Sequence, residues 1–333
     1  MPILTQPLRQ MSRFFSPRTL SAHYAFKGAS EKFFAFSPEH QIQLVQSDVA
    51  GTLVDPYCLA PLNALHNIFA RRQFELTHEQ ITGPMGLKKI DHIKHLLFVE
   101  LSAKWQQRHG RVPNDKDAEE LHDELINKLN ASVASFSQLT PHADVAIDFL
   151  RRHSIPLALT TGYSRQTATL ALSKLDQYVV STTADEVVNG TRFEMIEANM
   201  QKLCLPSSEM KRVVFITDAV SDVESIRKAA KLNGALNVWT FCIGDYCTGI
   251  EGITSQKQAA SMSADELCER RERAKERLLA SKPHAVLKNL SELPHAIVAA
   301  CQALSENKTP EGTPSLVIET PSDEQHSAND LRL

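Results

Sequence analysis

Short apolar runs alternate with helical patterns through the second half of the chain. A short apolar run bounded by polar residues is typical of a buried strand, and apolar residues spaced three and four apart are typical of a helix. This alternation predicts an α/β fold with a doubly wound, mostly parallel, Rossmann-like sheet. The predicted strands are 41–47, 155–159, 178–180, 213–216, 237–242 and, at an edge, 285–287. The helices predicted between them are 144–152, 164–175, 193–203, 220–232 and 263–279.

Helical patterns alone fill the stretch that follows the first predicted strand. Leu121, Leu125 and Leu129 share one helical face, and Thr77 and Gln80 have the spacing of a capping box at a helix start. We therefore expect a helical cap that is inserted into the core. The predicted domains are an N-terminal extension of 1–38, a core of 39–57 and 138–304, a cap of 58–137 and a tail of 305–333.

The two ends of the chain differ in composition from the middle. Residues 1–30 contain no Asp or Glu but carry several Arg and Ser residues, which is the composition of an organelle transit peptide and also suits a disordered extension. Residues 305–333 are rich in Ser, Glu, Asp, Pro and Thr, and this predicts a disordered tail.

Bulk composition narrows the function classes. A net charge of −3 and an isoelectric point near 6.5 offer no basic footprint for nucleic acid. No stretch approaches the roughly 20 apolar residues of a membrane span. The six cysteines include no C-x-x-C pair, which favours reduced thiols inside a cell. We expect a cytoplasmic protein without nucleic-acid or membrane partners; the acid-free N-terminus makes the mitochondrion the alternative location.

Polar residues stand at the ends of three predicted strands. Asp48 follows the first strand, Thr160 and Thr161 follow the second, and Asp218 closes the run from Val213. Because ligands of such sheets bind beyond the carboxyl ends of the strands, these side chains are expected to share one site. Asp48 is a candidate nucleophile that could attack phosphorus and form an aspartyl-phosphate.

A divalent cation is expected beside this nucleophile, because the carboxylate must meet an anionic substrate. Mg²⁺ prefers oxygen ligands, and Asp48, Asp218 and Asp222 could supply them. Thr161 and Gly162 could bind a phosphoryl oxygen at the start of a helix. Arg192 is the candidate to neutralise phosphoryl charge, although the sequence equally allows it to be a surface arginine.

These strand-end motifs, in this order, resemble the haloacid dehalogenase superfamily. Most phosphatases of that superfamily carry a second aspartate two residues after the nucleophile, where this chain has Ala50. The run from Gly83 to Ile93 resembles the cap motif of the phosphonoacetaldehyde hydrolase (phosphonatase) family, whose first motif also has alanine at this position. The resemblance spans about residues 42–300.

The resemblance implies a mechanism and a set of site residues. Lys89 would form an imine with the aldehyde of phosphonoacetaldehyde, Asp48 would attack phosphorus, and the C–P bond would break to give acetaldehyde and phosphate. His92 matches a position implicated in proton transfer. The resemblance also implies phosphonate catabolism and a homodimer. The cavity would be lined by Cys58, Met85 and Tyr163, and Mg²⁺ would be held by Asp48, the backbone carbonyl of Ala50, Asp218 and Asp222.

The chain departs from the family pattern at several positions. Gln46 and Ser47 precede the nucleophile where the family is usually apolar, which favours a looser strand end. Thr217 replaces the glycine expected before Asp218. The segment 190–195 carries an apparent deletion near Arg192, and residues 244–247 stand where the family is richer in glycine and aliphatic residues.

Two other readings remain open at the level of sequence. The chain could be another phosphatase of the same superfamily that uses Asp48 without chemistry at Lys89. It could also be a non-catalytic relative that binds a ligand, because the altered segment 186–195 could have removed activity.

Overall fold

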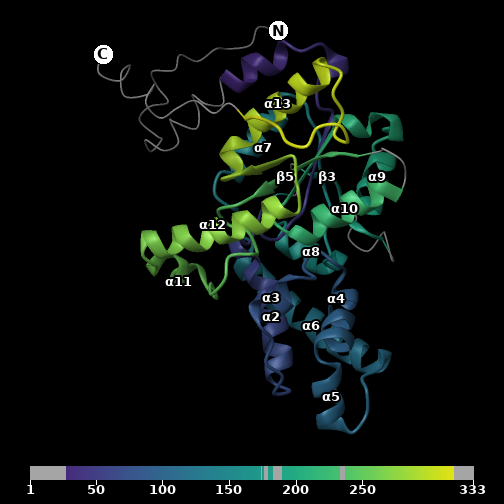
Figure 1. Cartoon of the computed structure of the whole chain (residues 1–333), viewed down its shortest axis with the longest axis vertical. Coiled ribbons are helices and arrows are strands. Elements are labelled where there is room, and N and C mark those ends of the chain that lie inside the picture. Colours follow the sequence, from purple (N-terminus) through teal and green to yellow (C-terminus); the bar gives the residue numbers. More distant parts are fainter. Residues whose placement is uncertain (1–27, 174, 176–178, 183–189, 233–236, 319–333) are drawn as a thin grey trace.

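A computed structural model describes residues 28–173, 175, 179–182, 190–232 and 237–318. Its centre is a six-stranded sheet with the order β3-β2-β1-β4-β5-β6, in which all pairs are parallel (Figure 1). The first strand in sequence lies in the middle, since Val45 pairs with Leu157 on one side and Val214 on the other. The strands are β1 (Leu44–Ser47), β2 (Leu157–Leu159), β3 (Val179–Thr182), β4 (Val213–Thr217), β5 (Trp239–Ile243) and β6 (Ala285–Leu287).

Helices cover both faces of the sheet because successive side chains of the buried strands point to opposite faces. Leu44 and Phe215 pack with apolar residues of α9 and α10, whereas Val45 and Val214 belong to the cluster that includes α7 and α13. The doubly wound core expected from the alternating pattern is therefore confirmed. The core helices are α7 (Ala143–Arg152), α8 (Arg165–Ala171), α9 (Arg192–Lys202), α10 (Val220–Leu232), α11 (Gln256–Ser261), α12 (Ala264–Ala280) and α13 (Leu293–Ser305), with the 3₁₀ turns η7 (Ser207–Arg212) and η8 (Leu290–Glu292).

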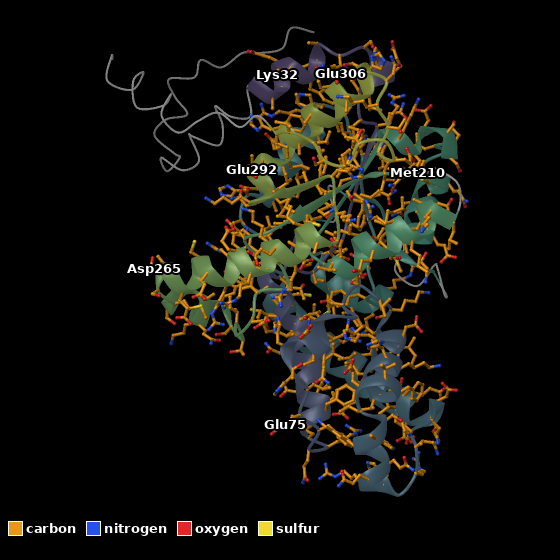
Figure 2. All side chains as sticks on the ribbon, viewed as in Figure 1. Lys32, Glu75, Met210, Asp265, Glu292 and Glu306 are labelled. Atoms are coloured by element: carbon orange, nitrogen blue, oxygen red, sulfur yellow. The ribbon has the colours of Figure 1, made fainter. Side chains whose placement is uncertain are left out.

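A group of helices follows β1 and extends from one end of the core (Figure 1). The expected capping box at Thr77 is present, a second one forms at Asn114, and Leu121, Leu125 and Leu129 are all buried. The elements are η3 (Pro56–Cys58), α2 (Leu59–Ala70), α3 (His78–Thr82), α4 (Lys89–His95), the π-helical η4 (Leu96–Glu100), α5 (Ser102–His109), α6 (Asp115–Ser132) and η5 (Val133–Phe136). In Figure 2, Glu75 marks this group, and Lys32 and Glu306 lie at the opposite end of the molecule.

The chain enters the cap through an unusual backbone. Asp55, Tyr57 and Cys58 all have left-handed φ values, of 56°, 70° and 55°. Such a conformation costs a residue other than glycine about 1–2 kcal/mol. Two contacts hold the segment in place: Asp55 accepts hydrogen bonds from the first amides of α2, and the amide of Tyr57 donates to the carbonyl of Tyr246 at 2.9 Å.

Both expected disordered ends are partly folded. Residues 28–34 form a helix that buries Ala29 and Phe33, and the Phe33 ring lies edge-on to Phe149 at 6.1 Å between ring centres. After α13, the amide of Leu316 donates to the carbonyl of His284 at 2.8 Å. The expectation for 1–38 was therefore wrong for 28–38, and that for 305–333 was wrong for 305–318, because these segments carry apolar residues that the core buries. The rest of both ends lies outside the described residues.

Candidate active site

Asp48 stands at the carboxyl end of the central strand. Its amide donates to the carbonyl of Ile216 at 2.9 Å, which continues the β1–β4 pairing. The residue is only 8% exposed. The neighbouring Gln46 was expected to loosen this strand end, and this expectation was wrong. Gln46 is buried, donates to the carbonyl of Ile196 at 3.0 Å and accepts from Asn199 at 3.0 Å, so it ties β1 to α9.

The turn after Asp48 brings a second carboxylate close. Gly51 has a φ of +86°, and a Cβ there would lie 2.2 Å from Oδ2 of Asp218. Only glycine allows this approach. This close approach allows the hydroxyl of the next residue, Thr52, to donate to Oδ1 of Asp218 at 3.0 Å. The amide of Thr248 donates to Oδ2 at 2.8 Å, and the Thr248 hydroxyl donates to the same oxygen.

Arg192 connects Asp48 with Asp222, the third aspartate of the cluster. It is the first residue of α9, whose N-cap is Thr191. Its Nη1 lies 3.1 Å from Oδ1 of Asp48, and its Nε lies 2.9 Å from Oδ1 of Asp222. Nη1 also donates to the hydroxyl of Thr160 at 2.8 Å. The sequence alone allowed Arg192 to be either a site residue or a surface arginine. In the structure it is buried within the site.

The charges of this cluster favour a bound cation. Burial raises the pKa of Asp48 to about 7 and that of Asp218 to about 6, against the effects of Arg192 on the first and of hydrogen bonds on the second. Three buried carboxylates face one arginine here, and oxygen donors of this kind suit Mg²⁺. Within the described ranges, no three His, Cys, Asp or Glu side chains converge on a single metal position.

Lys89 reaches the same site from the cap. It is the first residue of α4 and is 6% exposed. Its Nζ lies 3.9 Å from the sulfur of Met85 and 5.6 Å from the ring centre of Tyr163, which belongs to the core. Burial lowers the pKa of Lys89, with the charge of Asp48 opposing the shift. A lowered pKa makes the neutral, nucleophilic amine more accessible.

Three other expected residues surround this amine. His92 lies one turn further along α4 and is fully buried; burial, and then the nearby charge of Lys89, put its pKa well below the usual range. Burial likewise raises the pKa of Cys58 and of Tyr163. Among the described residues, the Tyr163 hydroxyl and both ring nitrogens of His92 have no hydrogen-bond partner of good geometry. The buried surroundings of His92, Cys58 and Tyr163 therefore favour their neutral forms.

The cap and the core meet closely at two glycines. A Cβ on Gly162 would lie 2.4 Å from the carbonyl oxygen of Leu87, and one on Gly86, with φ +97°, would lie 2.3 Å from Oδ1 of Asp222. Arg192 Nη2 donates to the carbonyl of Gly86 at 3.2 Å. The same cap loop accepts a hydrogen bond at the Met85 carbonyl from Ser221. These contacts form the seam between cap and core, which covers the carboxylates.

Sequence reasoning brought most of the site together and missed its hydroxyl groups. Thr161, expected to bind a phosphoryl oxygen, is buried, and its hydroxyl accepts from the amide of Tyr163 at 3.1 Å. Thr52, Thr248 and Ser221 were not singled out. Thr52 and Ser221 lie inside the recognised motifs, so their position was a usable signal. Thr248 lies in a loop whose approach to Asp218 depends on the strand order.

Comparisons with known proteins agree with this geometry. Residues 42–230 match the family model that is described as haloacid dehalogenase-like hydrolase. The chain therefore belongs to the haloacid dehalogenase-like hydrolases, which confirms the core expected from its strand ends.

Proteins of similar sequence identify the family of this chain within the class. A phosphonoacetaldehyde hydrolase of Parabacteroides distasonis is 31% identical over 267 residues, which cover 77% of this chain and 96% of the relative. One of Syntrophobacter fumaroxidans is 27% identical over 81% of this chain and 95% of its own length. The crystal structure of a phosphonoacetaldehyde hydrolase-like protein from Oleispira antarctica shares the fold, with a TM-score of 0.72 at 24% identity over 81% of this chain and 96% of that one. Within its class, the chain belongs to the phosphonoacetaldehyde hydrolase family.

No helix in the described part of the chain is long and apolar enough to cross a membrane.

Proposed function

We propose that this protein hydrolyses the carbon–phosphorus bond of phosphonoacetaldehyde to acetaldehyde and phosphate. The observation that carries the proposal is the inward, buried position of Lys89, with a lowered pKa, over a site that contains Asp48 and Arg192. A phosphatase of the same fold has no need for an amine at this place. The family relationship supports the same substrate.

The first step is imine formation. The neutral Lys89 amine attacks the aldehyde carbon and water leaves. His92, one turn away and buried neutral, is proposed to move the protons that this step requires. The protonated imine is an electron sink directly attached to the carbon that is bonded to phosphorus.

The second step breaks the C–P bond. An oxygen of Asp48 attacks phosphorus while the bonding pair flows from carbon into the imine, which becomes an enamine. Arg192, with Thr161 and Gly162 at the start of α8, is proposed to bind the phosphoryl oxygens. The leaving atom is carbon, so the absence of an acid at Ala50 removes nothing that this reaction needs. Protonation of the enamine and hydrolysis of the imine release acetaldehyde, and water cleaves the aspartyl-phosphate.

The site fits Mg²⁺ through its surplus of buried carboxylates. Asp48, Asp218 and the backbone carbonyl of Ala50 are the proposed ligands, with Asp222 bracing Arg192 beside them. The cation would neutralise charge on the phosphoryl group as Asp48 approaches.

The test combines product release with covalent trapping. Phosphonoacetaldehyde should yield acetaldehyde and phosphate in equal amounts, and borohydride added during turnover should reduce the imine onto Lys89, where peptide mass spectrometry would locate it. Hydrolysis of simple phosphate esters with no trapping would instead indicate a phosphatase. Failure of both reactions would leave a non-catalytic relative.

A further inference from the structure

Two threonines that were not among the expected site residues, Thr248 and Thr217, donate hydrogen bonds to the carboxylates of Asp218 and Asp222. Thr248 lies beyond β5 and donates to Oδ2 of Asp218 through both its amide, at 2.8 Å, and its hydroxyl. With Thr52 on Oδ1 at 3.0 Å, three donors fix both oxygens of Asp218. All three residues are buried. The plane of this carboxylate is therefore set before any ligand binds.

Thr217 does the same for Asp222. Its hydroxyl donates to Oδ2 at 2.7 Å and accepts from the amide of Ala219 at 3.1 Å. Since Oδ2 is held in this way, Oδ1 of Asp222 faces Nε of Arg192 at 2.9 Å. Thr217 thus fixes the orientation of Asp222, and Asp222 fixes the guanidinium that reaches Asp48.

Thr217 is itself a departure from the family pattern, and Thr248 directly follows a segment that departs from it. The family pattern has glycine at the position of Thr217, and a glycine has no hydroxyl to make either bond. The segment 244–247, which leads into Thr248, also departs from the pattern. The cost of an unpaired buried carboxylate is high, so donors that reach both oxygens stabilise the closely packed site.

We propose that Thr248 and Thr217 are positioning residues of this active site. Thr248 orients Asp218 toward a divalent cation, and Thr217 orients Asp222 so that Arg192 presents its outer nitrogens to a phosphoryl group. The inference rests on the proposed function for the identity of the phosphoryl ligand, whereas the cation and inorganic phosphate can be measured without turnover.

The first arm of the test concerns the cation. Thr248→Val keeps the shape and the amide donor but removes the hydroxyl, and Thr248→Ser keeps both donors. Mn²⁺ binding to the full chain would be titrated by electron paramagnetic resonance without substrate. Loss of a bond that orients a metal ligand typically weakens binding by about 10- to 100-fold. We expect this for Thr248→Val, with Thr248→Ser close to the wild type.

The second arm concerns the arginine. Thr217→Val should weaken binding of inorganic phosphate, measured by calorimetry at saturating Mn²⁺, while the Mn²⁺ affinity stays near that of the wild type. Thr217→Ser should restore phosphate binding. Thermal unfolding of all four variants identifies any that do not fold. If a valine variant does not fold, the serine variant at that position decides whether the hydroxyl donor is needed for ligand binding.

Three outcomes would overturn the proposal. These are valine variants that bind both ligands like the wild type, serine variants as weak as valine variants, or equal losses of both ligands at both positions. If the ligand shifts appear as expected but phosphonoacetaldehyde is not consumed, the positioning roles stand and the proposed reaction fails.

Discussion

The side-chain nitrogen Nζ of Lys89, in the cap, lies 5.6 Å from the ring centre of Tyr163, in the core. This contact settles the direction of the lysine: it points into the seam between the two parts of the chain and away from solvent. The Tyr163 amide also binds the hydroxyl of Thr161. The residue that meets the amine is thus anchored in the strand-end motif that is proposed to bind phosphate.

Replacement of Lys89 tests the amine chemistry. Lys89→Arg should be nearly as inactive as Lys89→Ala, because a guanidinium stays protonated and forms no imine. Product release from phosphonoacetaldehyde is the measurement. Lys94→Arg, on the exposed face of α4 with an ion pair to Asp115 at 2.7 Å, is the matched control and should keep full activity. An active Lys89→Arg enzyme would refute imine catalysis.

Replacement of Asp48 separates the two covalent steps. Asp48→Asn should lower phosphate release by at least about a thousand-fold, since an amide is a poor nucleophile. The variant should still form the imine, because Lys89 is unchanged. Borohydride trapping with phosphonoacetaldehyde therefore remains positive while turnover stops. Retained phosphate release would remove Asp48 from its proposed role.

A methyl group at Gly162 should prevent closure of the seam. The added Cβ would meet the Leu87 carbonyl oxygen at 2.4 Å, and a misplacement of about 1 Å can cost about a hundred-fold in rate. We expect a loss of that size in kcat/KM for Gly162→Ala, with little change in the unfolding temperature. Gly28→Ala, where nothing lies within 4 Å of the new Cβ, is the control. Normal kinetics in Gly162→Ala would show that this contact is not needed for catalysis.

His92 should make the folded protein sensitive to acid. Its folded pKa lies well below the unfolded value of about 6.5, so below pH 6.5 the unfolded chain binds more protons than the folded one. Stability contributed by neutral His92 is therefore present above pH 6.5 and falls as pH drops. The limiting slope is about 1.4 kcal/mol per pH unit.

Urea unfolding at pH 7.5 and pH 5 measures this effect. His92→Phe should lose less stability than the wild type between the two values, while His66→Phe, at an exposed position of α2, should follow the wild type. Parallel losses in the wild type and His92→Phe would mean that His92 becomes protonated in the folded protein.

Periodicity predicted the core well because its elements are locally determined. The helix expected over 220–232 has those bounds, the edge strand 285–287 is present, and Ser164 and Ser263, the first residues of two predicted helices, are the N-caps of α8 and α12. The strand ends that carry Asp48 and Asp218 follow from the same pattern. Each of these signals is contained within a few neighbouring residues.

What the sequence could not show depends on contacts between distant segments. The helix α5 has only Trp105 buried, so it carries a weak apolar stripe, and the segment 96–100 winds as a π-helix. From sequence alone, Gln46 is an unexplained polar residue in an apolar strand; in the structure its side-chain oxygen accepts a hydrogen bond from Asn199. Thr248 reaches Asp218 only because β5 lies next to β4.

The segment Asp55–Cys58, in which three residues have left-handed φ values, restricts how this enzyme could exchange parts with its relatives. Asp48 and Lys89 belong to one unbroken stretch of chain, and the bend at 55–58 lies between them. A chimera that takes a foreign cap would have to inherit this bend, together with its hydrogen bond to Tyr246, as one module. Recombination within 55–58 would instead separate the amide of Tyr57 from its own sequence context while Tyr246 stays in the core.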